Sequence, residues 1–285
     1  MIEIHYNNPA TKFEIIKFTF NREVAILSPS WVTNKDHQRR STRNFRCHNA
    51  NHVDVILQNI VKAFKDPFPF NMYYSIAKYQ DGLPKFSPNL QLRDTSQWNK
   101  EHYLHMTSYD FFIDIDAPDH SNVIHAHDDA IRISAFLNTY NVPYELRFSG
   151  CGFHIIIPHE YFETLHKSFD PNKENNIYTF YKQLAIWFSD QFTEFIDLNV
   201  YDSRRLCKLP YTIVQYENLN VMCLPFTSNE AFLNFKILDA YIENIPYIRG
   251  RGTRVFNNDP SKWDCKKLLK YTGVMDDDKR TKKGD

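Results

Sequence analysis

The chain has 285 residues, of which 42% are hydrophobic and 24% are charged, as in ordinary globular proteins. This composition excludes a disordered tail, a collagen-like fibre and a coiled coil, and no apolar run reaches the roughly 18–20 residues of a membrane span. The 34 basic and 34 acidic residues cancel, so no overall positive field marks a nucleic-acid-binding protein. Residues 246–285 nevertheless hold 11 Lys or Arg and 6 Asp, a net charge of +5, which allows local contact with a polyanion.

Hydrophobic periodicity predicts helices and strands in a mixed order. Apolar residues recur at helical spacing over residues 53–64, 126–140, 177–195 and 260–271. Strand-like stretches lie at residues 13–20, 23–27, 71–78, 109–116, 144–149, 153–157 and 210–215. The mixed order and the short connections indicate an α+β or mixed-sheet fold rather than a regular βαβ repeat.

The five cysteines form no CxxC pair. Isolated thiols in odd number are typical of a reduced, cytoplasmic protein rather than of a disulfide framework or a zinc knuckle. Cys47, His48 and His52 would make at most half of a zinc site, and a helix start explains them better, so no zinc is predicted. Because the amino terminus also lacks the basic and apolar segments of a signal peptide, we expect a cytoplasmic location and no membrane partner.

The strand-like segment ending Ile113-Asp-Ile-Asp116 places two carboxylates two residues apart. Side chains alternate along a strand, so Asp114 and Asp116 share one face while Ile113 and Ile115 point into the core. Two such carboxylates repel each other, and a divalent cation removes the repulsion. Ligation by oxygen alone suits Mg²⁺ or Mn²⁺. The alternative is a strand end that runs into a solvated turn, since Ala-Pro-Asp follows directly.

The segment Ser149-Gly-Cys-Gly-Phe-His154 predicts two strands joined by a tight Gly-x-Gly turn. Gly150 and Gly152 would expose successive backbone N–H groups, and Ser149 and His154 would add further donors. Together these donors could form an anion nest for the phosphates of a nucleotide. The alternative is an ordinary hairpin with a histidine satisfied at its edge.

A third candidate segment follows the helix expected over residues 177–195. It begins with Asp197 and leads through Arg204, Arg205 and Lys208 to Pro210. Asp197 could complete a metal cage with the first two carboxylates, while Arg205 and Lys208 could neutralise phosphate. The alternative is a surface ion pair between Asp202 and Arg204.

Taken in order, these three motifs resemble those of the archaeo-eukaryotic primase superfamily. That family shows a hydrophobic-Asp-hydrophobic-Asp strand, a Ser-Gly-x-Gly-x-His hairpin, and an Asp leading into a basic strand that ends in Pro. The resemblance spans roughly residues 15–215. It is strengthened by three segments that look like the catalytic small subunit of archaeal primases: Asn21–Val24, Tyr73–Ser75 and Ile196–Pro210.

The resemblance implies an α/β N-terminal module packed against an RRM-like mixed sheet, with the active site between them. It implies a catalytic core over residues 1–245 and a basic C-terminal extension over residues 246–285, whose end is disordered or a linker. By analogy, Asp114, Asp116 and Asp197 would be the catalytic residues and would hold two Mg²⁺ or Mn²⁺ ions. The implied nucleotide-binding residues are Ser149, Gly150, Gly152, His154, Arg205, Lys208 and Arg46.

Two departures from the family pattern stand out. The chain lacks the zinc knuckle that is common in replicative primase small subunits. Ile213-Val-Gln215 stands where family members tend to place a His or Arg, which puts one triphosphate contact in doubt. Plasmid, viral and CRISPR-associated primase-polymerases also lack the knuckle, and they often sit within longer polypeptides with further domains or subunits.

The leading hypothesis is therefore a template-dependent nucleotidyltransferase, a primase or primase-polymerase. Its substrates would be nucleoside triphosphates and a template and primer strand. One alternative is a CRISPR-associated or mobile-element enzyme that mainly fills gaps. A nuclease using the same carboxylates is another, and a catalytically inert nucleic-acid-binding module is the alternative of a different class. Ribo- or deoxyribonucleotide preference, initiation or extension, and the biological pathway all stay open.

Overall fold

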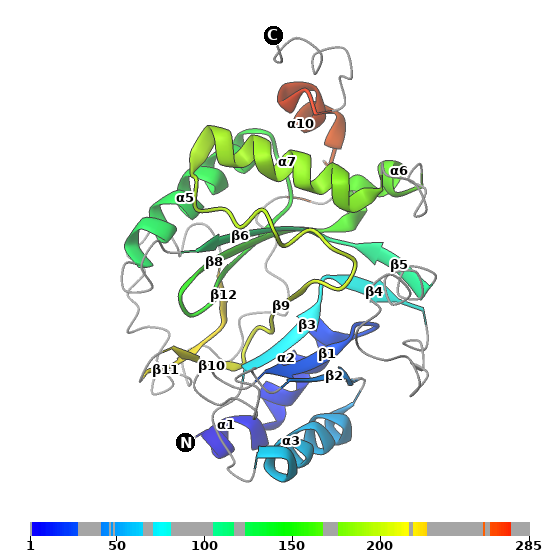
Figure 1. Cartoon of the computed structure of the whole chain (residues 1–285), viewed down its shortest axis with the longest axis vertical. Coiled ribbons are helices and arrows are strands. Elements are labelled where there is room, and N and C mark those ends of the chain that lie inside the picture. The colour runs from blue at the N-terminus through cyan, green and yellow to red at the C-terminus, as the bar shows by residue number, and fades with distance from the viewer. Residues whose placement is uncertain are drawn as a thin grey trace.

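Two four-stranded antiparallel sheets form the centre of the molecule (Figure 1). The N-terminal sheet has the strand order β2 (Ser41–Phe45), β1 (Val24–Leu27), β3 (Asn71–Ser75) and β9 (Leu206–Lys208). The central sheet has the order β12 (Leu224–Phe226), β7 (Glu145–Phe148), β8 (Gly152–Ile157) and β6 (Phe111–Asp116). The computed structural model describes residues 2–27, 41–45, 47, 49–64, 71–80, 105–116, 123–167, 176–216, 219–226, 259 and 263–274.

Two short strand pairs complete the sheets of the described chain: β4 (Ala77–Tyr79) with β5 (Met106–Tyr109), and β10 (Ile213–Tyr216) with β11 (Leu219–Met222). The strand expected over residues 71–78 is interrupted at Ile76, so β3 and β4 belong to different sheets. Ser75 helps to fix this corner, because its hydroxyl accepts from Glu23 N and donates to Ala77 O. Similarly, Asp110 separates β5 from β6 within the stretch expected at residues 109–116.

Helices α5 (Val123–Thr139) and α7 (Ile177–Phe192) cover one face of the central sheet (Figure 1). Both were expected from their apolar spacing, and both are confirmed, although α7 ends three residues before the expected end. Asn176 caps α7 by accepting from Tyr178 N and Thr179 N. Helix α10 (Cys265–Thr272) packs near these helices, since the Tyr271 ring lies against Phe136, Tyr140 and Trp187. Between β8 and α7 run a 3₁₀ turn, η1 (His159–Phe162), and the short helix α6 (Glu163–His166).

The N-terminal sheet is accompanied by α1 (Ile2–Asn7), α2 (Pro9–Thr19) and α3 (Ala50–Phe64). Helix α2 corrects the strand expected over residues 13–20. Asn8 caps this helix by accepting from Ala10 N, and Pro9 stands at its first position, a combination that favours a helix start. The buried residues Thr11, Ile15 and Phe18 recur at helical spacing, which outweighs the β-branched and aromatic composition that had suggested a strand.

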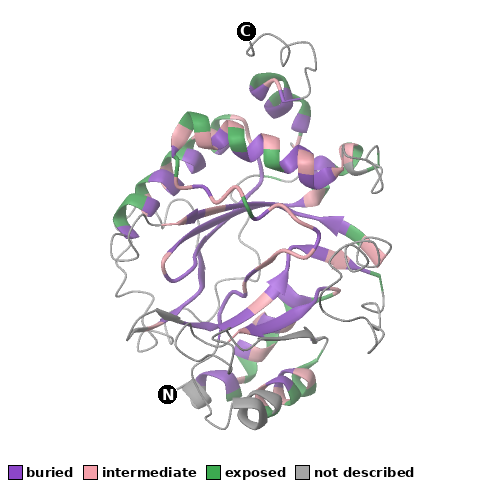
Figure 2. Ribbon diagram, in the orientation of Figure 1, coloured by how far each residue is buried: buried purple, intermediate pink, exposed green. Residues whose placement is uncertain are grey.

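The N-terminal sheet lies beyond the face of the central sheet that α5 and α7 leave open (Figure 1). Most residues of the central sheet and of β1 and β3 are buried (Figure 2). Arg147 on β7 joins the two sheets, because its Nη1 lies 2.6 Å from the hydroxyl of Tyr74 on β3. The helices and antiparallel sheets confirm an α+β fold. Within the described residues, none of the helices combines the length and apolarity needed to cross a membrane.

Candidate functional site

Strand β6 presents the first two candidate ligands on one face. Ile113 and Ile115 are fully buried, whereas Asp114 and Asp116 are half-buried. In the antiparallel pairing with β8, Asp114 lies opposite His154 and Asp116 lies opposite Gly152. Both carboxylates are therefore placed beside the Ser149–His154 hairpin.

Asp197 reaches the same place because residues 195–197 run along the outer edge of β6. Asp116 N donates to Phe195 O at 3.1 Å, and Asp197 N donates to Asp114 O at 2.9 Å. An antiparallel bridge joins Ile115 to Ile196 between these two bonds. This register sets Asp197 opposite Asp114, and directly opposed residues share a face of the sheet.

The three carboxylates converge on one point. One oxygen from each of Asp114, Asp116 and Asp197 lies within 4.8 Å of the others. Such proximity of like charges is unfavourable without a counter-charge, and a donor set of oxygen atoms alone fits Mg²⁺ or Mn²⁺. The residues present thus fit the divalent ions expected from the sequence.

Two basic side chains border this carboxylate cluster. His154 Nε2 lies 3.2 Å from Asp114 Oδ1, while its buried Nδ1 has no hydrogen-bond partner among the described residues. Lys208, on β9 of the N-terminal sheet, lies with its Nζ 3.5 Å from Cys151 Sγ in the hairpin turn. The cluster therefore lies between the central sheet and the strand that carries Lys208.

The pKa values of the two carboxyls on β6 move in opposite directions. Burial alone would raise the pKa of Asp114, but the charges of His154, Lys208 and Arg205 outweigh it and hold the value below the usual range. Burial and the neighbouring Asp114 charge raise the pKa of Asp116. Lys208 keeps its proton, because the groups around it raise its pKa despite its burial. The site thus combines the protonated Lys208 side chain with two carboxylates, Asp114 and Asp116, that repel each other and are stabilised by nearby positive charge.

The hairpin between β7 and β8 forms as expected, and its glycines have packing roles. Gly150 adopts a φ of +107°, a conformation that favours glycine. A Cβ on Gly152 would lie 2.2 Å from the carbonyl oxygen of Ile115, so only glycine permits this approach of β8 to β6. Ser149 is buried, and its backbone N donates to Gly152 O at 2.9 Å. The glycines are therefore required by the strand geometry beside Asp116, whatever the turn binds.

The remaining candidates are placed differently. Arg205 donates to Asn199 O at 2.6 Å and to Asp202 Oδ2 at 2.8 Å. The ion pair with Asp202, which the alternative interpretation assigned to Arg204, is therefore formed by Arg205. Its charge still contributes to lowering the pKa of Asp114. Arg46 lies outside the described residues, as does most of the basic extension predicted at residues 246–285.

Sequence reasoning missed the buried polar groups that support the site. Arg147 and Glu145 form an ion pair in which both side chains are fully buried, and Arg147 also reaches Tyr74. Tyr201 donates to Phe112 O at 2.8 Å, which fixes the segment after Asp197 to β6. The one available signal was the pair of charged residues, two apart, on the strand expected over residues 144–149.

No family model matches the chain, and no curated protein matches it. Among solved structures, the chain is similar to one described as "Polymerase Domain from Mycobacterium tuberculosis Ligase D in complex with DNA". The identity is 10%, the match covers 81% of this chain and 81% of that chain, and the TM-score is 0.41. A likeness of this degree does not establish a shared activity.

Proposed function

We propose that the chain is a template-dependent nucleotidyltransferase, a primase or primase-polymerase, that adds nucleotides to a 3′-hydroxyl. The convergence of Asp114, Asp116 and Asp197 within 4.8 Å carries this proposal. Three motifs that are far apart in the sequence meet at this point, which agrees with the resemblance to archaeo-eukaryotic primases. Nucleotide substrates, a template and a primer are its proposed partners.

The carboxylates Asp114, Asp116 and Asp197 would hold two Mg²⁺ or Mn²⁺ ions. When bound, these ions would neutralise the charge that develops on the α-phosphate and the attacking 3′-oxygen. Lys208 would bind the triphosphate, because its ammonium group stays charged next to the hairpin turn. His154 would offer its Nδ1, which has no hydrogen-bond partner among the described residues, as a further hydrogen-bonding group for the nucleotide or for a water molecule.

Ser149, Gly150 and Gly152 would supply the backbone part of the triphosphate site, with Arg205 and Arg46 as further proposed contacts. No covalent enzyme intermediate is required, since positioning and charge neutralisation suffice for this chemistry. The four-stranded central sheet, covered on one face by α5 and α7, is the part of the chain that we assign to the proposed RRM-like module, within a core over residues 1–245.

Primer extension tests the proposal. A labelled primer on a template is incubated with Mn²⁺ and either ribo- or deoxyribonucleoside triphosphates, with wild type, Asp114→Asn and Asp190→Asn compared. Asp190 is exposed on α7 and serves as the matched control. We expect extension by wild type and by Asp190→Asn, and a loss of at least about 100-fold in Asp114→Asn.

Other outcomes distinguish the alternatives. Shortening of the labelled strand would indicate a nuclease. The absence of extension together with no thermal stabilisation by Mn²⁺ and a triphosphate would overturn the proposal and favour a nucleic-acid-binding module. Repeating the reaction without primer asks whether the enzyme also initiates strands.

A further inference from the structure

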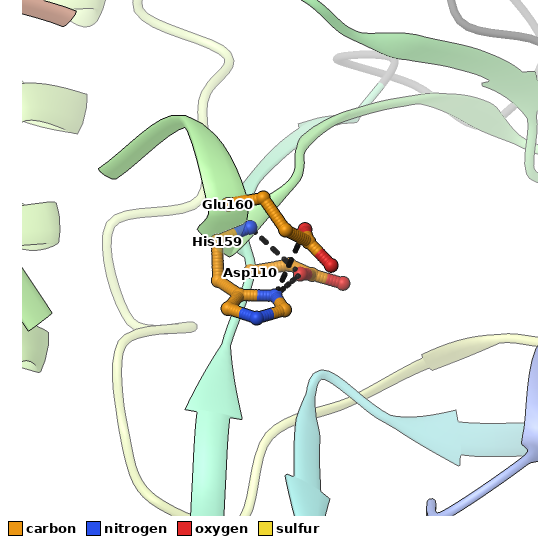
Figure 3. Close-up of side chains that lie close together, drawn as sticks. All are labelled: Asp110, His159 and Glu160. Carbon is orange, nitrogen blue, oxygen red and sulfur yellow. Dashed lines mark hydrogen bonds and ion pairs between the residues drawn. The ribbon is translucent and has the colours of Figure 1, made fainter. Parts of the chain in front are cut away.

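A second group of ligand-type side chains lies at the opposite end of β6 from the carboxylate cluster. Asp110 directly precedes β6, and His159 and Glu160 open η1 directly after β8 and Pro158. Their side chains converge (Figure 3). His159 Nδ1 lies 3.3 Å from Asp110 Oδ1 and 3.0 Å from Glu160 Oε2. We call these three residues the His159 cluster.

The donor atoms of the His159 cluster lie close enough together to share a single ion, since one atom from each residue lies within 4.8 Å of the others. A tetrahedral ion with bonds of about 2.0–2.1 Å holds neighbouring ligand atoms about 3.3 Å apart, close to both distances from Nδ1. An imidazole nitrogen carries at most one hydrogen, yet Nδ1 faces two carboxylate oxygens. A divalent cation in place of that hydrogen would engage all three atoms at once.

The outer atoms of the cluster are held by groups that do not belong to it. Arg22 Nη2 donates to Asp110 Oδ2 at 2.5 Å, and Lys78 Nζ donates to Glu160 Oε1 at 3.3 Å. Each carboxylate thus gives one oxygen to a basic side chain and turns the other toward Nδ1. Outer partners that orient ligand groups in this way are typical of metal sites.

Arg22 extends this support into the N-terminal sheet. Its guanidinium is buried and also donates to the carbonyl oxygens of Ser75 and Ile76. Asp110 itself is buried, and its Oδ1 accepts from the backbone N of His159 at 3.0 Å. Both carboxylate oxygens of Asp110 are thereby held in place before any ion binds. Glu160 is partly exposed, so an ion could reach the cluster from the solvent.

We propose that Asp110, His159 and Glu160 bind one divalent transition-metal ion of the Zn²⁺ type, with a water molecule as the fourth ligand. One imidazole and two carboxylates form a nitrogen and oxygen set that suits such ions, in contrast to the oxygen-only carboxylate cluster. The ion would tie η1 to the β5–β6 junction. This site departs from the expectation of no zinc, and it is independent of the proposed polymerase activity.

Cobalt absorption tests this site directly, because four-coordinate Co²⁺ with a nitrogen ligand absorbs visible light strongly. The untagged chain is titrated with Co²⁺ in excess Mg²⁺, which occupies oxygen-only sites. Wild type is compared with His159→Gln and Glu160→Gln. The controls are Glu163→Gln, which changes an exposed carboxylate paired with Lys167, and Asp114→Asn in the other cluster.

We expect one equivalent of Co²⁺ to give the visible band in wild type and in both controls, with displacement by Zn²⁺. His159→Gln should abolish the band, and Glu160→Gln should weaken Co²⁺ binding at least 10-fold, with circular dichroism showing both variants folded. Glu160 is half-exposed, so its variant stays informative if His159→Gln fails to fold. The proposal would be overturned if wild type gave no band. It would also be overturned if His159→Gln and Glu160→Gln both kept the band, or if Asp114→Asn lost it.

Discussion

Asp197 lies directly opposite Asp114 across the strand pair that residues 195–197 form with β6. Like charges in opposed positions destabilise a sheet, and Asp116 adds a third carboxylate to the same face. The arrangement is therefore unfavourable for folding unless cations compensate it. Local destabilisation of this kind is typical of residues that serve a reaction rather than the fold.

The first prediction concerns this repulsion. Asp197→Asn removes one of three like charges, so we expect the metal-free protein to become more stable by about 0.2–1 kcal/mol. The same change should reduce the stabilisation that Mn²⁺ gives to wild type. Thermal unfolding with EDTA and with Mn²⁺ measures both effects. A lower melting temperature in EDTA would contradict the account, and Asp190→Asn supplies the control for charge alone.

The second prediction concerns Gly152. A methyl group there would meet the Ile115 carbonyl oxygen at 2.2 Å and push β8 away from β6, next to Asp116. We expect Gly152→Ala to cost about 1–3 kcal/mol in unfolding free energy and to weaken Mn²⁺ binding. Gly273→Ala is the control, since its φ is +64° but its Cβ would meet no atom within 4 Å. Gly273→Ala should lose about 1–2 kcal/mol in unfolding free energy and bind Mn²⁺ as wild type does. If both variants weakened Mn²⁺ binding equally, the close approach of β8 to β6 at Gly152 would not be what supports the metal site.

The sequence predicted those parts of the molecule that depend on local pattern. Alternation along Ile113–Asp116 indicated which side chains share a face, and apolar spacing indicated α5 and α7. The pattern failed at residues 13–20, where the cap formed by Asn8 and Pro9 favours a helix. The pairing of Asp197 with Asp114 depends on residues 83 positions apart meeting at one strand edge, which no local signal encodes. The sequence offered Asp197 only as a candidate third ligand, and the family resemblance favoured it.

The sequence also could not predict the buried polar contacts between distant segments. Arg22 meets Asp110 at 2.5 Å, although 88 positions separate them, and Arg147 reaches Tyr74 across the two sheets. Such contacts depend on how the sheets pack. The charged residues on the buried strand β7 could have signalled only that a partner was needed.

The third prediction uses the buried pair of Glu145 and Arg147. Arg147→Met takes the guanidinium from a fully buried carboxylate, and we expect a loss of about 3–5 kcal/mol. Changing both residues to Met removes both charges, and it should restore at least about 2 kcal/mol of that loss. Urea unfolding of the single and double variants measures the coupling. Additive losses would contradict a direct pairing of the two charges.

The fourth prediction concerns the pH dependence of stability. Burial raises the thiol pKa of Cys207 from 9.0 to about 12, so the folded state keeps a proton that the unfolded state releases above about pH 9. The contribution of this thiol is complete below pH 9 and is lost as the pH rises toward 12. Between pH 8 and pH 10, we expect the unfolding free energy of Cys207→Ala to fall by about 1 kcal/mol less than that of wild type. Equal falls in urea unfolding would contradict the burial of this thiol.

The central claim is that Asp114, Asp116 and Asp197 form the metal centre of a nucleotidyltransferase. Anomalous diffraction from crystals grown with Mn²⁺ and a non-hydrolysable nucleoside triphosphate tests it most directly. The account predicts two Mn²⁺ peaks about 3.5–4 Å apart within bonding distance of the three carboxylates, with the triphosphate extending toward Lys208 and the Ser149–His154 hairpin. Crystals that hold Mn²⁺ or triphosphate elsewhere and leave these carboxylates without a peak would contradict it.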